Sequence, residues 1–165
     1  MSIQVEWQTM KVSIIPFQDQ YAKYFYRLNY DWLDEFFYVE DYDELVLRNC
    51  KKEIIDKGGF IFFALYNSNI VGTMALLPRG DRVFELNKMA VKKDLRGKGI
   101  GNQLISFIID FSKKKKLKSI ILYSNTVLKN SIHLYTKFGF KEIDNPDAPY
   151  ERSDIKMELL LSNSW

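Results

Sequence analysis

The segment Arg96–Gly101, which reads Arg-Gly-Lys-Gly-Ile-Gly, separates an extended stretch of the chain from a helical one. An apolar run over residues 83–91 precedes the segment, and apolar residues at helical spacing follow it as far as Phe111. A strand, a glycine-rich turn and a helix start form a phosphate-binding arrangement, because glycine lets the backbone approach closely and the helix N-terminus carries partial positive charge. We therefore expect an α/β fold that binds a phosphate-bearing ligand here, with further positive charge from Arg96 and Lys98.

Hydrophobic patterning predicts strands and helices along the rest of the chain. Strands are expected over residues 11–15, 60–66, 70–77, 83–91, 119–123, 140–143 and 154–161. Helices are expected over residues 18–37, 41–57, 100–116 and 128–137. This order predicts a mixed sheet with helices on both faces.

The composition is that of one folded domain, which we take to span residues 1–165. No apolar run approaches the ~18 residues of a membrane span, and the N-terminus lacks the pattern of a signal peptide. The single cysteine, Cys50, forms no internal disulfide, so we expect a cytoplasmic protein with no membrane partner. The net charge of +3 is too small to indicate nucleic-acid binding.

A second motif follows about 30 residues after the glycine turn, and together the two motifs resemble those of the GNAT superfamily of acyl-CoA N-acyltransferases. The glycine motif of that superfamily, Arg/Gln-x-x-Gly-x-Gly/Ala, is matched by Arg96, Gly99 and Gly101. Its later motif is matched by Asn130, Leu134-Tyr135 and Gly139-Phe140. The resemblance implies the GNAT fold, a central mixed and mostly antiparallel sheet of about seven strands flanked by about four helices.

Two further segments, residues 85–91 and 150–157, are similar to a bacterial subgroup in which this domain is often fused to a MarR-type DNA-binding domain. We expect no such partner domain within these 165 residues.

The resemblance implies acetyl-CoA as cosubstrate and no metal. The backbone N–H groups of the glycine turn would bind the pyrophosphate, at Arg96, Gly97, Lys98, Gly99, Ile100 and Gly101. The pantetheine arm would pair like an extra strand along Met89, Ala90 and Val91, with a bulge near Met89 aiming an N–H group at the thioester oxygen. Asn125 and Asn130 are expected to contact the cofactor, as is Tyr135.

Two residues are the catalytic candidates that the resemblance implies. Glu85 would remove the proton of the acceptor amine, directly or through a water molecule, and its structural alternative is a surface glutamate on a strand. Tyr135 would protonate the leaving thiolate, because a phenol with a pKa of ~10 keeps its proton at neutral pH. Its structural alternative is a core tyrosine.

The acceptor region is expected near residues 31–44, which hold seven acidic residues and no basic one. This segment is either a solvated helix end or the entrance for a cationic substrate. Some of the eleven aromatic residues over 17–42 would line the acceptor pocket, and Tyr150, Arg152 and Asp154 would border it. We expect a small-molecule or peptide amine, and a homodimer remains open.

Two rivals to an N-acetyltransferase remain at this stage. A non-catalytic acyl-CoA sensor or interaction module would keep the same fold. A nucleotide-binding domain fits less well, because the turn lacks the Gly-Lys-Ser/Thr ending of a triphosphate-binding loop. Of the remaining reactive side chains, Cys50 is expected in the core and His133 at the surface.

Overall fold

The computed structural model describes residues 9–146 and 151–161, and these residues form a seven-stranded sheet. Its spatial order is β1-β2-β3-β4-β5-β7-β6. The strands are β1 (Ser13–Pro16), β2 (Phe60–Tyr66), β3 (Asn69–Pro78), β4 (Val83–Val91), β5 (Ser119–Ser124), β6 (Lys141–Ile143) and β7 (Ile155–Leu160). Neighbours are antiparallel except β4 and β5, which are parallel. The expected mixed, mostly antiparallel sheet is confirmed.

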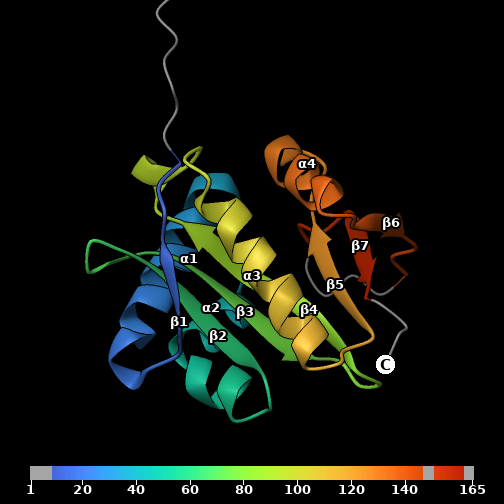
Figure 1. The fold of residues 1–165 in the computed structure, drawn as a ribbon, viewed down its shortest axis with the longest axis horizontal. Coiled ribbons are helices and arrows are strands. Elements are labelled where there is room, and N and C mark those ends of the chain that lie inside the picture. Colours follow the sequence, from blue (N-terminus) through green and yellow to red (C-terminus); the bar gives the residue numbers. More distant parts are fainter. Residues whose placement is uncertain (1–8, 147–150, 162–165) are drawn as a thin grey trace, which may run out of the picture.

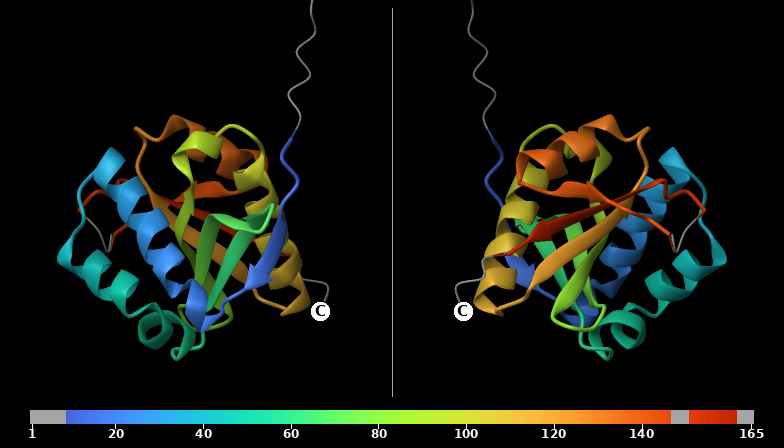
Figure 2. Two further views of the ribbon diagram at one scale, coloured as in Figure 1. Left: turned by 90° about the vertical axis from the view of Figure 1, so that its left-hand side faces the viewer. Right: turned by 90° about the vertical axis from the view of Figure 1, so that its right-hand side faces the viewer.

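Four α-helices cover the sheet within the described residues (Figure 1). They are α1 (Ala22–Phe36), α2 (Asp41–Arg48), α3 (Ile100–Lys114) and α4 (Lys129–Lys137). The first two cover one face, and α3 crosses the other face, as the side views show (Figure 2). Short 3₁₀ turns occupy Asp19–Tyr21 and Lys93–Leu95.

The helix expected over residues 41–57 is shorter than predicted. It ends at Arg48, and the chain continues as a π-helical turn over Lys51–Ile55. Asn49 interrupts the helix, because its side-chain amide donates to the Leu45 carbonyl at 2.9 Å and its backbone leaves the helical region. Cys50 is 3% exposed and packs in the core beside α2, as predicted.

The hydrophobic core lies in two clusters, one on each face of the sheet. On the α3 face, Leu104 and Ile108 pack against sheet residues such as Leu76. On the other face, Phe25 of α1 and Leu47 of α2 pack in a separate cluster. Because both faces of the sheet are buried, its central strands have nearly continuous apolar runs rather than a simple alternation.

The parallel pair at the centre of the sheet is short. The ladder joins Val83–Glu85 to Ser119–Ile121. Beyond it, β4 stays paired with β3 as far as Val91, whereas β5 stays paired with β7 as far as Ser124. The two strands therefore diverge toward α4 (Figure 1).

Strand β4 also carries a bulge opposite β3. Thr73 pairs with Ala90 and Ala75 pairs with Asn87, so Lys88 and Met89 together lie opposite one residue of β3. Lys88 has a φ of +50°, which a residue with a side chain seldom adopts. The bulge expected near Met89 is thus present.

Candidate active site

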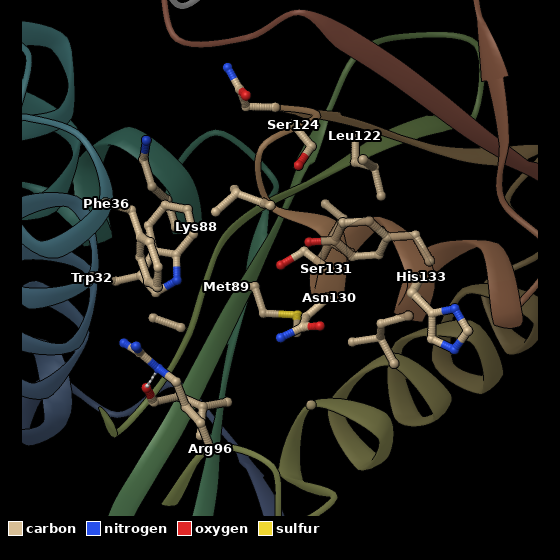
Figure 3. A pocket seen from close by; sticks show the side chains of 18 of the residues that line it. Trp32, Phe36, Lys88, Met89, Arg96, Leu122, Ser124, Asn130, Ser131 and His133 are labelled. Carbon is tan, nitrogen blue, oxygen red and sulfur yellow. Dashed lines mark hydrogen bonds between the residues drawn. The ribbon is translucent and has the colours of Figure 1, made fainter. Parts of the chain in front are cut away.

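A cleft of about 930 Å³ opens where β4 and β5 diverge. Its walls come from α1, from β4 with the glycine turn, from the end of β5 with α4, and from the segment before β7. In Figure 3, Trp32 and Phe36 lie on one side of Met89, and Ser131 and His133 lie on the other. The structure brings twelve predicted residues to the cleft: Glu85, Met89, Ala90, Val91, Arg96, Gly97, Gly99, Ile100, Gly101, Asn125, Asn130 and Tyr135.

The glycine turn forms an open backbone cradle at one end of the cleft. Gly97 and Gly99 have φ values of +77° and +83°, a region in which glycine is favoured. Gly99 is the N-cap of α3, so the first N–H groups of this 15-residue helix border the cleft. A Cβ added at Gly97 would meet no atom within 4 Å, so the space above Gly97 is open, whereas a Cβ added at Gly99 would lie 2.7 Å from Thr9 Cγ2. This geometry fits the phosphate groups of coenzyme A.

The two cationic side chains of the turn have different positions. Lys98 is exposed and does not line the cleft. Arg96 lines the cleft, but its guanidinium donates to Glu35 of α1 at 2.7 Å and to the Val91 carbonyl at 3.2 Å. It also lies 5.2 Å from the centre of the Phe36 ring. Arg96 therefore connects the turn to Glu35 of α1, which lies 61 residues earlier in the sequence. This contact was not predicted.

Glu85 lies at the inner end of the cleft, where the β4–β5 ladder ends. It is 2% exposed, so the alternative of a surface glutamate is wrong. One carboxylate oxygen accepts from Arg79 Nε at 3.0 Å, and the other accepts from Asn87 Nδ2 at 2.5 Å. A buried carboxylate with hydrogen-bond partners on both oxygens is held in a fixed orientation.

Tyr135 and Asn130 of α4 line the cleft. Tyr135 is half-buried, and its ring packs 5.9 Å from that of Phe140. Burial raises the pKa of the Tyr135 phenol to about 12, so its hydroxyl is a hydrogen-bond donor over the whole neutral range.

Asn125 has a structural role beside the cleft, because its amide donates to the Arg152 carbonyl at 2.6 Å and accepts from Val127 N.

The acidic residues over 31–44 do not line the cleft. Four of them are engaged by cations, in the pairs Glu35–Arg96, Glu40–Arg152, Asp43–Lys88 and Glu44–Arg48. The expectation of a cationic acceptor therefore receives no support from these carboxylates. The aromatic residues of this region do contribute, because Trp32, Phe36 and Phe37 line the wall formed by α1.

Of the late residues expected at the acceptor pocket, the structure describes Arg152 and Asp154, and Arg152 lines the cleft. Asp154 instead accepts hydrogen bonds from the backbone and hydroxyl of Thr126, at 2.8 and 2.7 Å. Tyr150 lies outside the described residues.

A buried charge cluster behind the bulge was missed by sequence reasoning. Asp43 of α2 is fully buried and accepts from Lys88 Nζ at 2.7 Å and from Arg152 at 2.7 and 2.9 Å. Burial acts to raise the pKa of the Asp43 carboxyl, but the hydrogen bonds from Arg152 and Lys88 outweigh it and lower that pKa. Burial lowers the pKa of the Lys88 ammonium, and Asp43 acts in the opposite direction.

Three basic side chains of α4 that the sequence did not mark as ligands also line the cleft: Lys129, His133 and Lys137. The positive charge of Lys129 and Lys137 on this wall favours an anionic ligand. Among residues 9–146 and 151–161, no group of three or more His, Cys, Asp or Glu side chains could hold a metal ion. No helix in that part of the chain is long and apolar enough to cross a membrane.

Comparison with known proteins agrees with this architecture. The family described as Acetyltransferase (GNAT) family matches residues 18–140, and the chain belongs to that family. The chain thus contains a GNAT acetyltransferase domain, and it spans less than half the length of several of the curated relatives it matches. One relative, the probable N-acetyltransferase 14 of Xenopus tropicalis, is 37% identical over 83 residues, which are 49% of this chain and 40% of that protein. Another, the uncharacterized N-acetyltransferase YvbK of Bacillus subtilis, is 30% identical over 62% of this chain and 68% of that protein.

Solved structures show the same fold. A GNAT-family acetyltransferase from Staphylococcus aureus Mu50 superposes with a TM-score of 0.83 at 23% identity, covering 92% of this chain and all of that one. The PaiA N-acetyltransferase from Thermoplasma acidophilum, solved in complex with coenzyme A, superposes with a TM-score of 0.72 at 22% identity, covering 92% of this chain and 99% of that one.

Proposed function

We propose that this domain transfers an acetyl group from acetyl-CoA to a primary amine by direct attack in a ternary complex. The proposal rests on one observation above all. The β4 bulge and the glycine turn border a single cleft together with Asn130 and Tyr135 of α4, which come about 30 residues later in the sequence. An elongated ligand with an anionic end fits such a cleft, because one end is an open backbone cradle and the other reaches a buried carboxylate.

The cosubstrate is proposed to be held along β4. The N–H groups of residues 96–101 bind the pyrophosphate, and Asn130 contacts the cofactor from α4. The edge of β4 on the cleft side, over Met89, Ala90 and Val91, pairs with the amide groups of the pantetheine arm in the manner of an added strand. The backbone N–H group of the bulge donates to the thioester oxygen and stabilises the negative charge that develops there.

Glu85 is proposed to act on the acceptor. An alkylamine with a pKa of ~10.4 has only about one molecule in several thousand unprotonated at pH 7. Glu85, directly or through a water molecule, accepts the ammonium proton, which frees the nitrogen lone pair to attack the carbonyl carbon. The second proton leaves the nitrogen for solvent as the tetrahedral intermediate becomes the amide. The carbon–sulfur bond then breaks, and the sulfur takes a hydrogen bond or a proton from Tyr135.

The test is release of free coenzyme A thiol from acetyl-CoA, measured over a panel of amines. The panel contains a lysine peptide, a polyamine, an aminoglycoside, an arylalkylamine and a neutral amino acid amide. Transfer to at least one amine, slowed in Tyr135→Phe while calorimetric binding of coenzyme A is retained, supports the proposal. Binding of coenzyme A with no transfer to any amine would instead favour a non-catalytic acyl-CoA sensor.

A further inference from the structure

The buried carboxylate of Asp43 connects α2 to two parts of the molecule that border the cleft. Asp43 belongs to α2 and does not itself line the cleft. Lys88, which binds it at 2.7 Å, belongs to the β4 bulge, and Arg152, which binds it at 2.7 and 2.9 Å, belongs to the segment before β7. The cluster therefore lies directly behind the wall at which the thioester is proposed to bind.

The bulge directs Lys88 toward this cluster. Leu86 and Met89 pack in the core on the α3 face. A strict alternation from Leu86 would place Lys88 on that same face. The extra residue of the bulge instead turns Lys88 to the opposite face, where its side chain is 3% exposed and reaches Asp43.

The conformation of Lys88 needs support from its surroundings. Its φ of +50° is unfavourable for a residue with a Cβ, and such conformations persist where the neighbouring structure holds them. Both its backbone and its side chain are held, because its backbone N–H donates to Asn87 Oδ1 at 2.6 Å and its ammonium donates to Asp43.

Stability alone is a poor explanation for this cluster. The side chains of Asp43 and Lys88 are 0% and 3% exposed, so both charges are removed from water. The cost of desolvating two charges often exceeds their attraction, and apolar residues of similar size usually stabilise a protein as well or better. A buried ion pair is better suited to fixing one geometry, and here that geometry is the backbone of the bulge.

We propose that Asp43 is a positioning residue. Through Lys88 it holds the β4 bulge in the conformation that aims the backbone N–H group near Met89 at the thioester oxygen. The proposal rests on the proposed function, because it assumes that the bulge binds this oxygen. Asp43 acts at a distance from the reacting atoms, so its loss should reduce turnover much more than it reduces cofactor binding.

The experiment compares Asp43→Asn with Glu44→Gln in the full chain. Glu44 is the next residue of the same helix, and it pairs with Tyr26 and Arg48 rather than with the bulge. Deuterium uptake of peptides covering residues 83–91 is measured by mass spectrometry, together with kcat, the KM for acetyl-CoA and the calorimetric Kd of coenzyme A. Lys88→Met and the double variant Asp43→Asn/Lys88→Met complete a mutant cycle.

We expect Asp43→Asn to raise deuterium uptake over 83–91 and to lower kcat by about ten- to a hundredfold, with Kd and KM changed by less than about threefold. Lys88→Met should have a similar effect, and the double variant should be no worse than either single one. Lys88→Met alone carries the test if Asp43→Asn does not fold, because Asp43 then keeps both bonds from Arg152.

Equal uptake over 83–91 in Asp43→Asn, Glu44→Gln and the unmodified protein would overturn the proposal. So would additive losses of kcat in the double variant. Failure of the proposed function is a separate outcome, seen when the unmodified protein acetylates no amine. The comparison of deuterium uptake over 83–91 then decides whether Asp43 holds the bulge.

Discussion

Replacing Tyr135 with phenylalanine removes only the hydroxyl group and leaves the ring that packs 5.9 Å from Phe140. Burial raises the pKa of Tyr135 to about 12, whereas an alkyl thiol has a pKa of ~8.5. Complete proton transfer from this phenol to a thiolate is therefore uphill by about 3.5 pKa units, or about 5 kcal/mol at 1.36 kcal/mol per unit. Tyr135 should accordingly stabilise the leaving thiolate by a hydrogen bond, and the sulfur should gain its proton later from solvent.

The expected loss of kcat depends on whether Tyr135 donates a hydrogen bond or a proton. A hydrogen bond to a charged group contributes about 1.5–3 kcal/mol, so Tyr135→Phe should lower kcat by about ten- to a hundredfold. The phenol is ionised in only about one molecule in a hundred at pH 10, because pH 10 lies about two units below its pKa. The pH–rate profile of the unmodified protein should therefore show no falling limb from Tyr135 between pH 7 and pH 10.

The assay is thiol release at saturating acetyl-CoA and amine, with coenzyme A binding measured by calorimetry. Tyr66→Phe is the matched control, because Tyr66 is a half-buried tyrosine at the end of β2 that does not line the cleft. A falling limb below about pH 10.5 that disappears in Tyr135→Phe would refute the hydrogen-bond reasoning. An unchanged kcat in that variant would remove Tyr135 from the mechanism.

Three further predictions concern the cofactor turn, the base and the buried cluster. Gly97→Ala should weaken coenzyme A binding by about five- to thirtyfold, because a left-handed alanine costs about 1–2 kcal/mol. Gly80→Ala, with φ +85° and equally open surroundings, should leave calorimetric binding unchanged. Glu85→Gln should lower the rate of acetyl transfer at pH 7. The difference in rate from the unmodified protein should narrow toward pH 9, because more of the amine loses its proton to solvent there. A ratio of the two rates that stays constant with pH would exclude a base role for Glu85. Arg152 and Lys88 hold the pKa of Asp43 below its usual range. The ionised Asp43 carboxylate therefore contributes stability above the unfolded-state pKa of ~3.9, and this stability is lost as the pH falls through the lower folded-state pKa. Urea unfolding at pH 3 and pH 7 should therefore show a smaller acid loss in Asp43→Asn than in the unmodified protein.

Local patterns were sufficient to predict the frame of the site. The apolar run over 83–91 is β4, and the apolar spacing after the glycines is α3. The resemblance of two short motifs to one superfamily then implied that distant segments meet, and Asn130 and Gly99 do line the same cleft. The strand and the helix were predictable because each depends on residues close together in sequence, whereas the meeting of Gly99 and Asn130 was implied by the family resemblance.

The contacts behind the cleft could not be predicted in this way. Asp43 and Lys88 are 45 residues apart, and a lysine on a strand ordinarily points to solvent. Only the bulge, which local alternation does not encode, turns Lys88 inward. Likewise Glu35 suggested a negatively charged entrance, whereas folding places it against Arg96. Charge composition gives the sign of a segment but not the partner that neutralises it.

The short ladder between β4 and β5 makes the sheet two half-sheets that share three residues on each strand. A ligand lying in the cleft touches both halves at once, so its binding energy adds to the cohesion of the folded domain. Stabilisation by such a ligand grows as RT ln(1 + [L]/Kd), or about 2.7 kcal/mol at a concentration one hundred times Kd. The resistance of this domain to heat and to proteolysis should therefore follow the supply of acyl-CoA around it.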